Sequence, residues 1–267
     1  MEGCMNLRMV KKLSPWGTRL MTFLPFREPI NALTHGMWML VCIPGIILLL
    51  RFAWGDRLKT IGLAVYGCTM ISCFFSSWLF HSVNGPDSVI EACRAMDHVC
   101  IYLFIAGTCT PVGLVYLEGR WRWAFLSSVW GLALTGIAMR VSGVPMPLYT
   151  RTTMYVLLGW LGILTYFQLV RKLSSRKVVP VWLGGVIYTT GAGLNLAGKP
   201  VLVEGILGPH EFFHCMVILG SLVHYYFMIR IMVKSPSRRK AEMAVQDLPE
   251  LLVFETSLAS HPLRKAG

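Results

Sequence analysis

Two histidines separated by one helical turn give the strongest chemical signal in this sequence. His210 and His214 flank Glu211 in the pattern H-E-x-x-H, and a spacing of four residues places both imidazoles on one face of a helix. The pattern is typical of zinc metalloproteases, where the histidines bind the metal and the glutamate is the base. Because Pro209 suits the first position of a helix, we predict a metal-binding helix that begins there.

Three further polar residues could complete such a site. His81 precedes the turn signal Asn84-Gly85-Pro86, and Ser77 lies one turn earlier on the same helical face. With His81, the pair supplies three nitrogen ligands, as in a catalytic zinc site that keeps one position open for water. Asp97 could orient a ligand or hold and deprotonate that water, and Ser77 could hydrogen-bond to the same groups.

The elements that position these residues are predicted to be membrane helices. Hydrophobic residues make up 55% of the chain and charged residues only 14%, which lies outside the usual range of soluble domains. Apolar stretches long enough to cross roughly 30 Å of hydrocarbon recur along the chain, so we predict an all-α, seven-transmembrane helical bundle. The expected spans are Thr34–Leu50, Thr60–Phe80, Val99–Leu117, Trp123–Met139, Thr152–Val170, Val178–Gly198 and Phe212–Ile229.

The order of these spans brings the polar residues to one membrane face. In a seven-helix serpentine, odd helices start and even helices end on the same side, so Asp97 and the three histidines share one level. Ionisable groups at this depth are functional candidates. His35 and His98 share the level, but a single histidine at a membrane edge usually sits at the headgroup boundary. We assign neither as a ligand, nor His224, which lies about 15 Å further along the last helix.

The charge pattern indicates how the chain is divided and what surrounds it. The net charge is +12, with Lys and Arg in the ends and loops rather than on one soluble face. This favours anionic lipid headgroups over nucleic acid, so membrane lipids are the expected environment and candidate substrate. We predict a basic N-terminal segment (1–26), the membrane domain (27–234), a disordered basic tail (235–267), and a multi-pass location in the plasma membrane.

Four runs of residues together carry a resemblance to a known family over about residues 26–234. They are Glu28-Pro29-x-Asn31-x-x-Thr34-His35, Ser77-x-x-x-His81, Asp97-His98-x-x-Ile101-Tyr102-x-x-Ile105-Ala106-Gly107-Thr108-x-Thr110-Pro111 and His210-x-x-x-His214. In combination they resemble the haemolysin III and adiponectin/progestin receptor (PAQR) family, and the short N-terminus is more similar to the haemolysin III branch. One departure is Phe80, where the family commonly has a tyrosine.

The resemblance implies both a metal site and a reaction. It implies a seven-helix bundle that holds one zinc ion with His81, His210 and His214, with Asp97 and Ser77 around it. It also places the family near the alkaline ceramidases, in a superfamily of metal-dependent membrane hydrolases that act on lipid amides. The leading interpretation is therefore an integral membrane zinc protein that hydrolyses lipid amides or esters.

Two other interpretations stay open on the sequence alone. In an intramembrane protease Glu211 would serve as the base, but such proteases take a third ligand from a downstream aspartate, and only Asp247 in the polar tail follows His214. In a receptor or membrane-lytic, haemolysin-type protein the zinc would be structural and no catalysis would occur.

Two criteria disagree on orientation. More Lys and Arg fall on the C-terminal side of the predicted spans, which favours a cytoplasmic C-terminus. The resemblance to adiponectin receptors implies a cytoplasmic N-terminus, with the metal site opening inward. We adopt the second orientation, because much of the basic excess lies in the tail.

Overall fold

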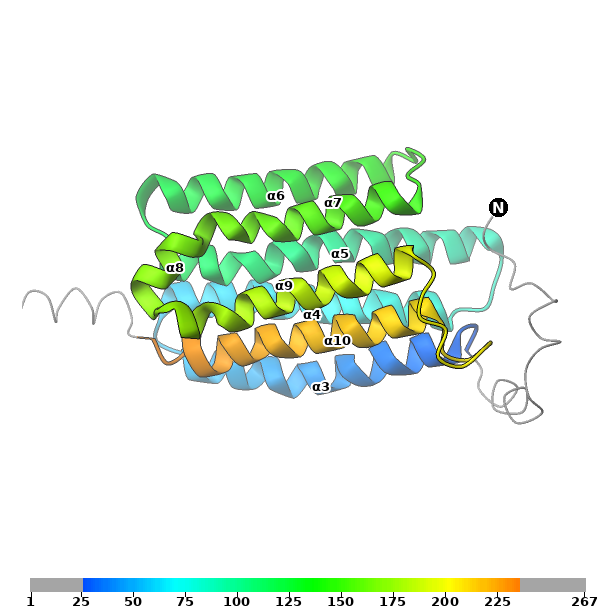
Figure 1. The fold of residues 1–267 in the computed structure, drawn as a ribbon, viewed down its shortest axis with the longest axis horizontal. Helices are drawn as coiled ribbons and strands as arrows, with labels where there is room; N and C mark the ends of the chain where they lie inside the picture. Colours follow the sequence, from blue (N-terminus) through cyan, green and yellow to red (C-terminus); the bar gives the residue numbers. More distant parts are fainter. Residues whose placement is uncertain (1–25, 236–267) are drawn as a thin grey trace, which may run out of the picture. The chain divides into compact units, whose positions relative to one another are not determined.

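A computed structural model describes residues 26–235 of the chain as a bundle of helices (Figure 1). The chain divides into two compact units, Met1–Val233 and Lys234–Gly267, and the helices belong to the first. Apart from their boundary residues, the predicted basic N-terminal segment and disordered tail lie outside the described residues. The helices are α3 (Pro29–Ala53), α4 (Arg57–Ser82), α5 (Asp87–Tyr116), α6 (Gly119–Val141), α7 (Leu148–Trp160), η1 (Leu161–Thr165), α8 (Tyr166–Leu173), α9 (Ser175–Leu196), α10 (Pro209–Phe227) and η2 (Met228–Met232).

The prediction of an all-α fold is confirmed for the described residues. Their regular elements are all helical, apart from one isolated bridge between Val203 and Leu207. Proline and turn signals set several helix boundaries. Pro29 and Pro209 each occupy the start of a helix, and the predicted turn at residues 84–86 separates α4 from α5.

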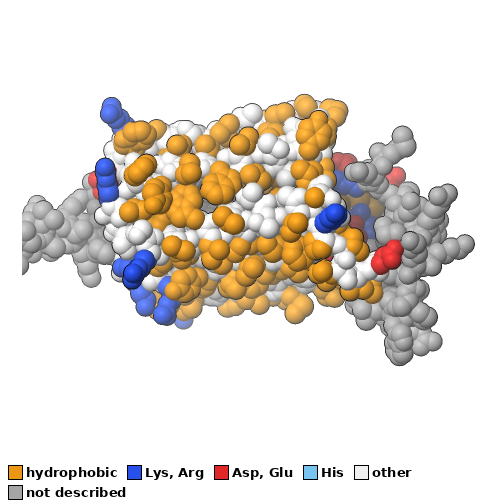
Figure 2. All heavy atoms as spheres, viewed as in Figure 1, with side chains coloured by type: hydrophobic (Ala, Val, Ile, Leu, Met, Phe, Trp, Pro, Cys, Tyr) orange, Lys and Arg blue, Asp and Glu red, His pale blue; other side chains and the backbone are white. Residues whose placement is uncertain are grey.

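Within residues 26–235, six helices are long and apolar enough to cross a membrane. They are α3, α4, α5, α6, the continuous run Leu148–Leu173, and the run Pro209–Met232. Their outer faces expose large apolar side chains such as Met37 and Leu40, and Figure 2 shows this apolar surface along the bundle, with basic side chains towards its ends. Such a surface is unfavourable in water but suits lipid. The predicted span Val178–Gly198 corresponds to α9, which is not among these six, so the count of seven spans stays a prediction.

The predicted start of the third helix was wrong. We expected Asp97 and His98 to open it, but α5 begins at Asp87, so Asp97 lies about 15 Å along the helix. The extra turns contain the charged residues Glu91 and Arg94, which form an ion pair at 2.8 Å. Because these turns are amphipathic rather than apolar, a search for apolar stretches does not detect them.

Helix α5 is the central packing element. It contributes side chains both to the larger core, which it shares with α3, α4 and α8 to α10, and to a smaller core, which it shares with α6 and α7. Its contact with α4 is close: a Cβ atom on Gly62 would lie 2.8 Å from the Pro111 Cα, and one on Gly107 would lie 2.0 Å from the Thr69 Oγ1. Small residues allow this approach, which holds α4 and α5 in close contact.

Candidate metal centre

Three imidazoles meet where the end of α4 faces the start of α10. His81 lies in the last turn of α4, while His210 and His214 occupy the first turns of α10. One nitrogen from each can be chosen so that all three lie within 4.8 Å of one another. His81 and His214 are buried, with 1% and 2% of their surface exposed. This group could hold a metal ion, because imidazole nitrogens are common ligands of zinc.

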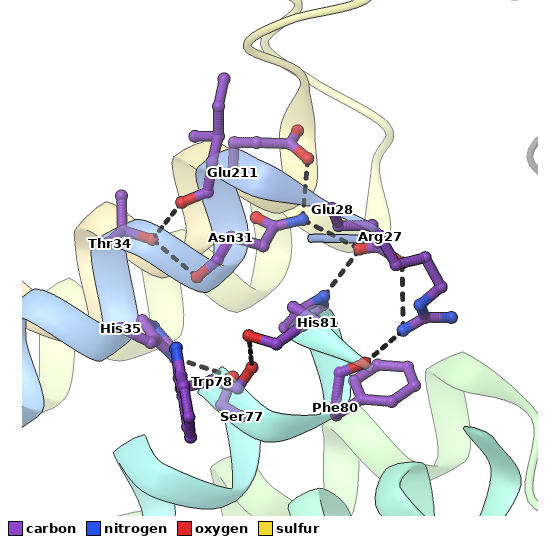
Figure 3. A network of polar contacts seen from close by, with 12 residues as sticks. Arg27, Glu28, Asn31, Thr34, His35, Ser77, Trp78, Phe80, His81 and Glu211 are labelled. Atoms are coloured by element: carbon purple, nitrogen blue, oxygen red, sulfur yellow. Dashed lines mark hydrogen bonds and ion pairs between the residues drawn. The ribbon is translucent and has the colours of Figure 1, made fainter. Parts of the chain in front are cut away.

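A carboxylate orients one of these imidazoles from outside the group (Figure 3). The His81 Nδ1 lies 2.7 Å from the Glu28 Oε2, and the Glu28 backbone N–H donates to the His81 carbonyl at 2.9 Å. Burial would raise the pKa of Glu28, but its contacts with His81, Arg27 and Asn31 lower it to about 2. The ionised carboxylate therefore engages Nδ1, which leaves the Nε2 of His81 for a metal.

Asn31 connects this carboxylate to a second one. Its side-chain amide donates to the Glu28 Oε2 at 3.1 Å and to the Glu211 Oε1 at 2.9 Å (Figure 3). The other Glu211 oxygen accepts from the Gly208 backbone N–H at 3.0 Å. Both Glu211 oxygens are thus engaged, and a negative charge is favourable at this helix start. Glu211 caps α10 and joins it to α3.

Ser77 links Asp97 to His35 on the other side of the histidines. The Ser77 Oγ lies 2.8 Å from the His35 Nδ1 and hydrogen-bonds to the Asp97 side chain. Since an ionised carboxylate only accepts hydrogen bonds, Ser77 donates to Asp97 and accepts from the His35 Nδ1–H. The His35 ring stacks on His214, with centroids 3.7 Å apart and planes at 15°. His35 thus supports the group, although we assigned it no ligand role.

The two other histidines that we left out of the site are engaged elsewhere. The His98 Nδ1 accepts from the Arg140 Nε at 3.1 Å. The His224 Nε2 bonds to the Val181 carbonyl at 3.0 Å. Neither belongs to the three-histidine group.

A cavity of about 250 Å³ extends from this site into the bundle. His210, His214, Asp97 and Ser77 are in its wall, and so is Arg151 from the first turn of α7. Most other lining residues are apolar, including Phe104, Val112, Val156, Val217 and Phe227. An apolar chamber with a few polar groups at one end is the usual form of a site for an amphiphilic ligand.

Phe80, the departure from the family pattern, is not a lining residue of the cavity. The Arg27 guanidinium lies 4.5 Å from the centroid of its ring, and the Arg94 guanidinium lies 5.5 Å from it. A tyrosine hydroxyl at position 80 would therefore extend from a ring that packs against two cations and does not line the cavity.

Sequence reasoning assigned no role to Glu28, Asn31 or Arg151. Glu28 and Asn31 belong to the first run that carried the family resemblance, and that run was the available signal. Both precede the first predicted span, Thr34–Leu50. Arg151 was missed because the predicted fifth span begins one residue after it.

Comparisons with known proteins show the family of this chain. The family model described as "Haemolysin-III related" matches residues 23–225. "Hemolysin-3 homolog" of Bacillus subtilis (strain 168) is 31% identical over 211 residues, which is 78% of this chain and 96% of the relative. "Hemolysin-3" of Bacillus cereus is 31% identical over 214 residues, 79% of this chain and 94% of the relative.

A mammalian relative matches as well. The human "Monocyte to macrophage differentiation factor" is 25% identical over 234 residues, 79% of this chain and 87% of the relative. Together with the six apolar helices, these matches show that the chain belongs to the haemolysin III family and is a multi-pass integral membrane protein.

Proposed function

We propose that this protein is a zinc-dependent hydrolase of lipid amides or esters. The observation that carries the proposal is the cavity, which has His210, His214 and Asp97 in its wall and apolar side chains over most of the rest. Cleavage of a lipid needs both parts, because polar groups act on the bond while an apolar chamber holds the hydrocarbon. Zinc-dependent release of fatty acid from a lipid amide or ester by the purified protein tests the proposal.

The donor set of the site fits zinc. Three imidazole nitrogens suit zinc, whereas magnesium and calcium take oxygen ligands. The His214 Nδ1 is a buried nitrogen with no hydrogen-bond partner among the described residues, and a metal ligand role for this side chain would explain its burial. Zinc bound by His81, His210 and His214 would polarise a carbonyl oxygen and lower the pKa of a water molecule to about 7.

Two residues of the cavity wall would handle the proton. The Asp97 carboxylate is the acceptor for the proton of the attacking water and would pass it to the leaving nitrogen or oxygen. Ser77 donates to this carboxylate and is itself held by His35, so the two residues would help to orient Asp97. Asp97 is 9% exposed, so few hydrogen bonds from bulk water to its carboxylate would compete with this role.

Arg151 would position the lipid head. Arg151 lines the same cavity as Asp97 and His210. A guanidinium at that place can hydrogen-bond to the carbonyl or headgroup oxygens of a lipid. The hydrocarbon would then extend along the apolar lining.

The contact between Glu28 and His81 yields a prediction on metal affinity. Glu28→Gln is expected to weaken zinc binding by about 10- to 100-fold, because the charged acceptor that orients a ligand is replaced by a neutral one. Competition with a chromophoric chelator on purified protein would measure this. Glu118→Gln is the control, since Glu118 is 61% exposed and pairs with Lys172, and it should leave the affinity unchanged. Equal zinc affinity in the two variants would contradict the role of Glu28 in orienting His81.

We also propose seven spans in the plasma membrane, with a cytoplasmic N-terminus and the metal centre facing the cytoplasm. An odd number of spans places the termini on opposite sides, and α9, at 22 residues, is long enough to cross. A reporter active only in the cytoplasm should therefore work when fused at Met1 and fail at Gly267, in fusions recovered with the plasma membrane fraction. Activity at Gly267 but not at Met1 would indicate the opposite orientation. Activity at both ends would indicate an even number of spans.

A further inference from the structure

A second polar site lies in the wall of the cavity, away from the histidine group. His224 of α10 and Tyr188 of α9 both line the cavity, and their rings are 5.5 Å apart in an edge-to-face arrangement. His224 lies ten positions after His214 along one helix, which corresponds to about 15 Å. The proposed hydrolase site does not use either residue.

The two rings are seated by glycines on the opposite helix. A Cβ atom on Gly184 of α9 would lie 2.3 Å from the His224 Nε2, and one on Gly220 of α10 would lie 2.7 Å from the Tyr188 Cε1. Each helix thus carries a glycine and a polar ring four residues apart, and each ring fills the space left by the other helix's glycine. Larger residues at 184 or 220 would displace the rings, so their positions are fixed by the helix contact.

Both rings present a polar atom without a partner. The Val181 carbonyl can only accept a hydrogen bond, so the His224 Nε2 carries the proton and its Nδ1 is an acceptor. That Nδ1 and the Tyr188 hydroxyl are buried and have no hydrogen-bond partner among the described residues. His224 is only 9% exposed. Unpaired polar atoms at such depth are unfavourable unless a ligand or a water satisfies them.

We propose that His224 and Tyr188 bind a hydroxyl group on the hydrocarbon part of the lipid in this cavity. An alcohol hydroxyl has the matching chemistry for both atoms, because it can donate to the His224 Nδ1 and accept from the Tyr188 hydroxyl. The ligand class is therefore a lipid with a polar head near the metal centre and a hydroxyl about 15 Å away. This inference rests on the proposed function only in that it takes the cavity to hold a lipid.

Binding of hydroxylated fatty acids tests the inference. The full-length protein in detergent would be titrated with stearate and with stearates that bear one hydroxyl at successive positions along the outer half of the chain. Displacement of a fluorescent fatty acid gives the affinities. One hydroxyl position is expected to bind about five- to tenfold more tightly than stearate, the gain from one well-placed hydrogen bond. Tyr188→Phe keeps the ring over Gly220 and should abolish most of that preference.

Tyr225→Phe is the matched control. Its hydroxyl donates to the Gly45 carbonyl at 2.9 Å, and Tyr225 does not line the cavity, so this variant should keep the hydroxyl preference. Stearate binding without preference for any hydroxyl position, or a preference that survives Tyr188→Phe, would overturn the inference and leave the lipid cavity intact. Failure of every fatty acid to bind would contradict the lipid cavity itself and so both proposals.

Discussion

Replacing His81, His210 or His214 by alanine is expected to reduce the zinc content of the purified protein from about one ion per chain to a small fraction of that. The three side chains are the described residues whose ligand atoms come within 4.8 Å of one another as a group, so two ligands remain after each change. The loss in zinc affinity should exceed the roughly 10- to 100-fold loss expected when a residue that only hydrogen-bonds to a metal ligand is changed. Elemental analysis of protein recovered as a single species from size exclusion would measure it.

Two other histidines serve as controls for this experiment. His224→Ala and His98→Ala should keep stoichiometric zinc, because His224 bonds to the Val181 carbonyl and His98 accepts from Arg140. Stoichiometric zinc in all three ligand variants would contradict the proposed metal site. Loss of zinc in His224→Ala as well would indicate a general defect of the bundle rather than loss of a ligand.

Replacing Asp97 by asparagine is expected to leave zinc in place while hydrolysis of a ceramide-like amide is lost. The asparagine side chain would have the same size and could still bond to Ser77, but an amide cannot accept the proton of water. Removing a general base typically costs about 10²- to 10⁴-fold in rate. Release of fatty acid from a labelled substrate, together with the zinc content of the same preparation, gives both quantities.

Glu211→Gln is the matched change at the other carboxylate, and it should cost at most about tenfold in rate. Glu211 uses its two oxygens to bind the Gly208 N–H and the Asn31 amide, and it does not line the cavity, whereas Asp97 does. An active preparation that lost turnover with Glu211→Gln and kept it with Asp97→Asn would replace this assignment with the protease-like one.

Spacing and helix order made much of the candidate site predictable. The spacing of four positions from His210 to His214 fixes their common face, and Pro209 fixed where that helix starts, as observed. The alternation of odd and even spans brought His81 and Asp97 to the same end without any tertiary information. These are properties of a single helix or of chain order, which a sequence contains directly.

Contacts that depend on side-chain direction were not predictable in this way. Glu28 reaches His81 from the turn before α3, and no local pattern relates two residues that lie 53 positions apart. The early start of α5 was missed for a related reason, since Glu91 is held partly by Arg140 at the end of α6. A polar helical turn of this kind is stabilised by its tertiary partners rather than by apolar periodicity.

The packing of His224 against Gly184 and of Tyr188 against Gly220 was not predictable from the sequence alone. Gly184 and Gly185 are adjacent in the sequence, but only Gly184 faces a neighbour, whereas nothing lies within 4 Å of a Cβ atom at Gly185. Which of two adjacent glycines meets the next helix depends on rotation about the helix axis. That rotation is set by packing between α9 and α10.

Zinc-dependent turnover tests the central claim most directly. Full-length protein in detergent would be stripped with a chelator, reloaded with zinc, and assayed for fatty acid release from ceramide-like amides and from the corresponding esters. We predict that release stops on stripping, returns with zinc in the native protein, and does not return in His214→Ala. Zinc-loaded native protein that binds fatty acids but cleaves neither amides nor esters would contradict the hydrolase assignment, and the metal would then be structural, as in a receptor or a membrane-lytic protein.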